Sequence, residues 1–219
     1  MYMSKNKHIS QAEFRGDPNL GLYGFATDEY CLSGVEFDGG VLDVPLKVVK
    51  VMNTGLVGMF VCGNSHGVMI PRTLEDYEIK KMENIFDNVL VLDSDMTALG
   101  NLCLINDKGI VLSPMLKKNK EEIEDFFGLD VVVSTVAKLN VVGSVAFCTN
   151  KGCITHPQIR DKEKKSIEKI LDVKSNIGTV NFGSPFPGTG ILANSSGFLI
   201  SSNTTGPELG RIDETLGFL

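Results

Sequence analysis

The chain has 219 residues, of which 42% are hydrophobic and 22% are charged, so it can bury a sizeable core and is not expected to be disordered. Its formal net charge of −6 argues against a protein that binds by neutralising many phosphate groups. No apolar stretch reaches the roughly 18–20 residues that would span a bilayer, and residues 1–8 lack the apolar region of a secretory signal. We therefore expect a cytoplasmic protein that does not enter a membrane.

A glycine-based pattern recurs along the chain. In four copies two glycines stand nine residues apart, and a first copy keeps only its first glycine. The first glycines are Gly21, Gly58, Gly100, Gly143 and Gly188, so the steps between copies are 37, 42, 43 and 45 residues. A period of roughly 20–50 residues is typical of repeat proteins. The sequence therefore predicts five units, which span residues 9–45, 46–88, 89–130, 131–172 and 173–219.

The first two units are defined by their turns and by the segments that follow. In the first unit the helix must lie near residues 44–51 (VPLKVVKV), although this pattern is poor for a helix. In the second unit Asn and Gly frame the sequence NSHG at 64–67, which is typical of a hairpin turn. A helix is predicted over 73–86, with Thr73 at its N-cap.

The third unit carries the clearest pattern. Strands are predicted at 89–94, 102–105 and 110–113, and the last two flank the turn NDKG. The Asn of this turn can hydrogen-bond its own backbone, and the Gly tolerates positive φ. A helix is predicted over 117–128, ending at Gly128. Each unit is thus expected to consist of three strands followed by one helix.

The fourth and fifth units repeat this order. Their turns are TNKG at 149–152 and NSSG at 194–197, and their helices are predicted over 161–171, capped by Asp161, and over 204–216. Three short strands cannot bury both faces alone, so the units must pack on one another. An open stack would need polar capping repeats at both ends, and neither end of the sequence resembles one.

We therefore infer an α/β fold in which five strand–strand–strand–helix units form one closed, five-fold pseudosymmetric α/β propeller. Its small sheets would form the ring and its helices would lie outside. The chain, residues 1–219, would be a single domain. The alternative is a two-layer α+β sandwich in which the glycines recur by chance.

Cysteine and histidine placement limits the possible chemistry. All five cysteines lie in or beside predicted strands and none forms a C-x-x-C pair, so we expect buried, reduced thiols. The three histidines, His8, His66 and His156, have no metal-ligand spacing, so no metal site is expected. The glycine-rich segments lack the G-x-x-x-x-G-K-[ST] pattern, which makes a nucleotide cofactor improbable.

The repeated segments resemble a known family. They are AEFRGDPNLGLYGFATDEYCL (12–32), VCGNSHGVMIP (61–71), ALGN (98–101), VGSVAFCTNKGCITHP (142–157) and IGTVNFGS (177–184). In this order they are similar to the translation initiation factor 6 family in its archaeal form, and the resemblance runs from about residue 9 to residue 219. It implies the closed five-unit propeller called the pentein fold.

The resemblance also implies a function without enzymatic activity. Members of this family of ribosome anti-association factors bind the large (50S) ribosomal subunit on its joining face and keep the small subunit off. The implied contacts are mainly with ribosomal protein uL14, beside the sarcin–ricin loop of the rRNA. We expect a monomer that uses no cofactor.

The rival reading is an enzyme. The pentein fold also hosts guanidino-group hydrolases such as arginine deiminase, which resemble one another in a covalent Cys near the chain end, a His and paired acids. A thiolate nucleophile needs a base within hydrogen-bond reach. No Cys follows Cys153, and strand alternation would put His156 on the face opposite Cys153. We therefore expect no catalytic residues; a scaffold for some other partner stays open.

The docking surface is predicted on the loops ahead of the first glycines. These loops, 52–58, 96–100, 137–143 and 180–188, should emerge at one end of the ring and expose small and apolar residues. The candidate partner-binding residues are Thr54, Gly55, Met59, Leu99, Gly100, Asn101, Leu139, Asn140 and Asn181. Asn101, in the ALGN motif that resembles the interface of the family, is expected to be the most sensitive to substitution.

Overall fold

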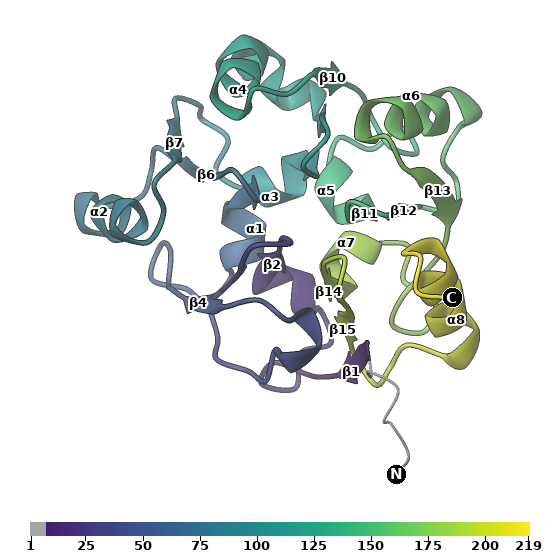
Figure 1. The fold of residues 1–219 in the computed structure, drawn as a ribbon. Coiled ribbons are helices and arrows are strands. Elements are labelled where there is room, and N and C mark those ends of the chain that lie inside the picture. Colours follow the sequence, from purple (N-terminus) through teal and green to yellow (C-terminus); the bar gives the residue numbers. More distant parts are fainter. Residues whose placement is uncertain (1–7) are drawn as a thin grey trace.

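The computed structural model describes residues 8–219 as five three-stranded sheets around a common centre, with longer helices at the periphery (Figure 1). This confirms the mixed α/β class, and the five sheets agree with five repeated units. Residues 1–7, on which the expectation of no secretory signal mainly depends, lie outside the described residues. Within 8–219, no helix combines the length and the apolar character that crossing a membrane requires.

Each sheet combines an antiparallel hairpin with a third strand that runs parallel to one hairpin strand. The first sheet contains β2 (Gly24–Ala26), β3 (Cys31–Ser33) and β4 (Leu46–Val48), and the second contains β5 (Cys62–Asn64), β6 (Gly67–Pro71) and β7 (Val89–Leu92). The third contains β8 (Cys103–Ile105), β9 (Ile110–Leu112) and β10 (Val131–Val133), and the fourth contains β11 (Ala146–Cys148), β12 (Gly152–Thr155) and β13 (Lys174–Ile177). The fifth contains β14 (Ile191–Ala193), β15 (Phe198–Ile200) and β1 (Ile9–Gln11).

The third strand of each sheet comes from beyond the predicted unit boundary. The strand predicted at 89–94 is β7, but it pairs with β6 of the preceding unit, where Val89 lies opposite Val68. Parallel strands need a long crossover connection, and a helix supplies it. The sheets are therefore built as hairpin, crossover and strand. The predicted order along the chain, three strands followed by a helix, holds in the second to fifth units, but the first strand of each unit belongs to the sheet of the preceding unit.

Four longer helices lie outside the sheets (Figure 1): α2 (Asp76–Ile85), α4 (Lys120–Phe127), α6 (Asp161–Leu171) and α8 (Gly206–Thr215). They confirm the four predicted helices to within a few residues, except that the first turn predicted for α4 belongs to a 3-10 helix, η3 (Pro114–Asn119). The predicted N-caps, Thr73 and Asp161, are wrong. The last extended residue is Glu75 before α2 and Arg160 before α6, so Asp161 already has helical backbone angles.

The first sheet has no such helix. The helix predicted near 44–51 is wrong, because this segment contains strand β4, with Leu46 opposite Cys31. Its connection holds only a 3-10 turn, η2 (Gly40–Leu42). The β-branched valines of the segment favour an extended backbone, and pairing with β3 satisfies that preference.

The two ends of the described chain meet in one sheet. Strand β1 pairs in parallel with β15, with Ile9 opposite Phe198 and Gln11 opposite Ile200. Nearby, the His8 Nε2 atom lies 2.7 Å from the buried Asp213 carboxylate of α8. Figure 1 shows the first strand beside the last units of the chain.

Five one-turn helices surround the centre: η1 (Leu20–Leu22), α1 (Val57–Phe60), α3 (Leu99–Leu102), α5 (Val142–Val145) and α7 (Pro187–Gly190). The glycine ahead of each hairpin, interpreted from sequence as part of a turn or loop, lies in or beside one of these helices. A Cβ on Gly100 would stand 2.0 Å from the Gly58 oxygen, and a Cβ on Gly143 would stand 2.0 Å from the Gly100 oxygen. Gly188 repeats this contact against Gly143, and Gly21 repeats it against Gly188. The absence of a side chain lets neighbouring backbones touch.

The buried core lies between the sheets. Each of the five apolar clusters takes side chains from two neighbouring sheets. Met69 of the second sheet packs with Ile110 of the third, and Cys31 of the first packs with Leu199 of the fifth. Burying one such side chain is worth about 1.5–3 kcal/mol. No sheet could bury these residues alone, so the units depend on one another.

Candidate partner-binding face

A repeated turn precedes four of the five central helices. Each turn is closed by a two-residue bridge, at Phe14–Asp17, Val51–Thr54, Val136–Leu139 and Val180–Ser184. Each turn stands at the same position of its unit, directly before the central helix, so the four turns occupy equivalent places around the centre. We call these four turns the turn face. In three of them two successive non-glycine residues have positive φ, and we call these pairs the left-handed tips: Met52–Asn53, Ala137–Lys138 and Asn181–Phe182. Such backbone is strained, so surrounding contacts must hold it.

A buried carboxylate holds one of these tips. Glu163, in the first turn of α6, accepts hydrogen bonds from the amides of Ala137 (3.1 Å) and Lys138 (3.2 Å) and from the Thr135 hydroxyl (2.6 Å). It also accepts bonds from the Arg160 amide (3.0 Å) and guanidinium (2.7 Å) at the start of the helix. One side chain therefore joins the helix start to the tip.

The same arrangement occurs at the other two left-handed tips. Glu208 of α8 accepts bonds from the amides of Phe182 (3.3 Å) and Gly183 (2.8 Å), and Glu78 of α2 accepts one from the Asn53 amide (3.3 Å). We call Glu78, Glu163 and Glu208 the tip-binding glutamates. The third unit has neither a bridged turn nor a left-handed tip among the described residues. At the corresponding place, Arg72 pairs with two exposed carboxylates, those of Asp93 and Asp95.

These bonds make the stability of the fold depend on acid pH. Burial raises the pKa of Glu163, but the hydrogen bonds from Arg160, Thr135 and Lys138 outweigh it and lower the pKa from 4.5 to about 2. A carboxylate with a depressed folded-state pKa contributes stability above its unfolded pKa and loses it as pH falls. The contribution of roughly 3 kcal/mol should therefore disappear as pH falls from 4.5 toward 2.

Urea denaturation at a series of acid pH values checks this prediction. Glu163→Gln should flatten the decline in unfolding free energy below pH 4.5, whereas Glu121→Gln, at an exposed position on α4, should leave it as in the native protein. Equal slopes for the native protein and Glu163→Gln would contradict it.

The ALGN motif lies in a central helix, α3, rather than in a loop. Asn101 and Gly100 are half-buried. Leu99 was expected to be exposed, and this expectation is wrong: its side chain is fully buried in the core between the second and third sheets. In a one-turn helix at the centre, the residue beside Gly100 points into the neighbouring cluster.

The second unit contributes Thr54, Gly55 and Met59, all half-buried. The Thr54 hydroxyl donates to the Val51 oxygen (3.2 Å) and accepts from the Leu56 amide (3.2 Å), so it closes its own turn. The hydrogen bonds of the Thr54 hydroxyl are thus made within the protein, without a binding partner. Met59 lies on helix α1.

The candidates of the last two units are more accessible. Leu139 and Asn140 are exposed at the end of the turn of the fourth unit, Val136–Leu139. Asn181 is half-buried at a left-handed tip, where its side-chain amide donates to the Pro18 oxygen (3.1 Å) and its side-chain oxygen accepts from the Thr204 hydroxyl (3.2 Å). Asn181 therefore connects the turn of the fifth unit to the first unit.

Two aromatic residues of the predicted loop 180–188 were missed from sequence. Phe182 is 83% exposed and Phe186 is 37% exposed. The available signal was the segment FGSPFPG, in which glycine and proline separate two phenylalanines and prevent a regular element from burying them. Two exposed aromatic rings four residues apart add apolar surface of the kind that is enriched in contacts between proteins.

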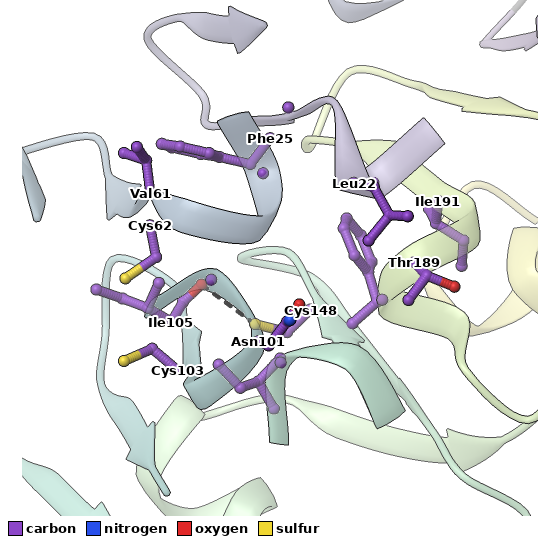
Figure 2. A pocket seen from close by; sticks show the side chains of 18 of the residues that line it. Leu22, Phe25, Val61, Cys62, Asn101, Cys103, Ile105, Cys148, Thr189 and Ile191 are labelled. Atoms are coloured by element: carbon purple, nitrogen blue, oxygen red, sulfur yellow. Dashed lines mark hydrogen bonds between the residues drawn. The ribbon is translucent and has the colours of Figure 1, made fainter. Parts of the chain in front are cut away.

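A cavity of about 90 Å³ lies between the central helices and the hairpins. Figure 2 shows Asn101, Cys148 and Thr189 among the residues that line it, and the Cys148 thiol donates to the Ile105 oxygen (3.3 Å). Small-molecule sites usually measure roughly 300–1,000 Å³, so this cavity is too small for a typical substrate. Across residues 8–219, no group of three or more metal-ligating side chains could hold a metal ion.

The cysteines are free thiols, four of them buried and Cys148 half-buried. Burial raises the pKa of Cys31 to about 12 and raises that of Cys153 further. Hydrogen bonding to Cys62 and burial raise the pKa of Cys103, and burial raises that of Cys148. Since only the thiolate is a strong nucleophile, these side chains are poorly suited to covalent catalysis.

Comparison with known proteins identifies the family. The eIF-6 family model matches residues 9–215. The chain is 35% identical to translation initiation factor 6 of Thermococcus onnurineus, in an alignment that covers 97% of this chain and 99% of that protein. It is 36% identical to translation initiation factor 6 of Methanocaldococcus jannaschii (96% and 99% covered) and 35% identical to that of Haloquadratum walsbyi (95% and 96% covered). The chain, as its repeated motifs predicted, therefore belongs to the eIF-6 family of translation initiation factors and is not an enzyme.

Proposed function

We propose that this protein binds the large (50S) ribosomal subunit on its joining face and prevents the small subunit from associating with it. Membership of the eIF-6 family carries this proposal, because it implies a ribosome-related partner. Blocking subunit association needs no catalysis, because a folded chain of 219 residues bound to the joining face excludes the small subunit sterically.

The main contact would be ribosomal protein uL14, with the sarcin–ricin loop of the rRNA beside it. A net charge of −6 favours docking on a basic protein surface over a contact dominated by phosphates. The turn face supports this choice, since Leu139 and Phe182 expose apolar surface there and Phe186 does so just after the last turn. Contacts between proteins are typically centred on such residues.

The factor would act in the cytoplasm as a monomeric, single-domain, closed ring of the pentein type. The pairing of β1 with β15 supports closure, because it joins the first described strand to the last sheet. The contacts of the central glycines support it too, because they run from Gly21 through each unit and return to Gly21.

Two assays test the function. Sucrose-gradient sedimentation with purified subunits should carry the protein with large subunits at one copy each, and light scattering should then report that these subunits no longer join small ones. Sedimentation with small subunits alone, or binding that leaves joining intact, would refute the proposal.

Asn101→Arg should weaken binding of the large subunit. Asn101 borders the central cavity, and in the described part of the chain its side chain forms no hydrogen bond that the substitution would break. A longer, charged side chain would protrude into a packed contact, where one residue can be worth roughly 2 kcal/mol, or about thirtyfold in affinity. The melting temperature should change little.

The matched control is Asn84→Arg, the same change at an exposed position on α2. It should bind as the native protein does. If Asn101→Arg also binds normally, the contact does not include the ALGN helix, even if the protein still blocks joining.

A further inference from the structure

Phe182 combines two features that the core does not require. Its ring is 83% exposed, and its backbone has a φ of +62°. A large aromatic side chain in water and a strained backbone are both unfavourable. Strain of this kind persists where surrounding contacts impose the conformation, and it concentrates at functional sites.

Glu208 imposes this conformation. Its Oε1 atom accepts bonds from the Gly183 amide (2.8 Å) and the Thr179 hydroxyl (2.7 Å). Its Oε2 atom accepts bonds from the Phe182 amide (3.3 Å) and from the Thr205 amide and hydroxyl (both 2.8 Å) at the start of α8. Burial raises the pKa of Glu208, but these hydrogen bonds outweigh it and lower the pKa, so the carboxylate stays charged.

Helix capping alone does not explain a carboxylate here. At the third position of a helix, Gln caps the N-cap amide as Glu does, because one acceptor oxygen is enough. Glu208 and Glu163 use both oxygens, and the additional bonds go to the tips. Three outer helices repeat the arrangement, although their N-cap residues differ (Glu75, Arg160 and Thr205).

We propose that the tip-binding glutamates are positioning residues that hold the left-handed tips ready for the partner, and that Glu208 presents Phe182 as an anchor of the contact with the large subunit. This inference rests on the proposed function, which it deepens by naming an anchor and its support. A tip ordered before binding loses less conformational freedom when it docks.

Glu208→Gln separates the two roles of the side chain. Gln keeps one acceptor oxygen for the helix start, while its amide nitrogen cannot accept the bonds of the other oxygen. The Thr205 and Phe182 amides share one oxygen of Glu208, so Gln can keep both bonds, whereas the Gly183 amide loses its acceptor. Amide hydrogen exchange at Gly183 should therefore accelerate by about tenfold or more while α8 stays protected. The affinity for purified large subunits should fall by about tenfold, and Phe182→Ala should lower it at least as much.

The matched control is Glu168→Gln on α6. Glu168 likewise accepts bonds from a backbone amide and a hydroxyl, those of Ser175 (2.9 and 3.0 Å), but it binds strand β13 and not a tip. It should leave subunit affinity unchanged. Thermal melting of each variant shows whether a loss of affinity reflects unfolding.

The outcomes distinguish this inference from the proposed function. If the native protein does not sediment with large subunits, the proposed function fails. If the native protein binds but Phe182→Ala binds equally well, the anchor role is wrong. If Glu208→Gln leaves the exchange of Gly183 unchanged, or accelerates it without lowering affinity, the positioning role is wrong.

Discussion

Gly100→Ala is expected to destabilise the protein by more than about 3 kcal/mol, enough to unfold much of a domain whose total stability is roughly 5–15 kcal/mol. The added Cβ would stand 2.0 Å from the Gly58 oxygen and 2.9 Å from the Val61 oxygen. Both atoms are backbone, so no side chain can rotate away. Helices α1 and α3 would have to separate, and the contacts of the neighbouring central helices would separate with them.

The control for this prediction is Gly210→Ala in α8. A Cβ at Gly210 meets no atom within 4 Å, so Ala should gain up to about 1 kcal/mol from helix propensity. The same substitution in two helices of one chain should thus have opposite signs in urea denaturation. A Gly100→Ala variant as stable as the native protein would contradict the close packing of the central helices.

A chain truncated after Asp172 is expected not to fold. It would lack β13, β14 and β15, so β12 and β1 would each lose a neighbouring strand. The cluster around Cys31 would lose Leu192 and Leu199, and Gly21 would lose the backbone of Gly188. The cluster around Phe198 would keep only Ile154 of its buried residues. Two exposed sheet edges and an incomplete core favour aggregation over a smaller folded state.

The control for the truncation is a chain that lacks residues 1–7. It retains every described strand pair, including β1 with β15, and should melt cooperatively like the full chain. Circular dichroism and analytical sedimentation distinguish the two fragments. A soluble fragment of residues 1–172 with a cooperative transition would mean that the units fold as an open array, and the proposal of a closed ring would be wrong.

The turns and the outer helices could be predicted from sequence because their causes are local. In the turn NDKG, the Asn106 side chain accepts hydrogen bonds from the amides of Lys108 (3.0 Å) and Gly109 (3.1 Å), as predicted. The expectation of positive φ at its glycine is wrong: Gly109 is needed because a Cβ there would stand 2.1 Å from the Ile170 oxygen. Helix α6 coincides with its predicted range. The family could be predicted as well, since the spaced glycines and the motifs around them are contiguous stretches of sequence.

The candidate site was predictable only in part. The turns of the docking surface follow from the repeat, and the exposure of Leu139 agrees with its position in one of them. The burial of Leu99 and the exposure of Phe182 did not follow, because burial depends on which neighbouring unit covers a side chain.

The amino-acid sequence by itself determined the hairpins, with their fivefold repetition, and the outer helices of the second to fifth units, because each hairpin and helix results from residues a few positions apart. Only the tertiary structure decided which sheet each third strand joins and whether residues 44–51 form a helix or strand β4. It also joined β1 to β15, segments at opposite ends of the chain. Which strands pair, which glycines touch and which side chains are buried depend on contacts between residues far apart in the chain. Periodicity and turn chemistry describe only residues close together in sequence, so they carry no information about those contacts.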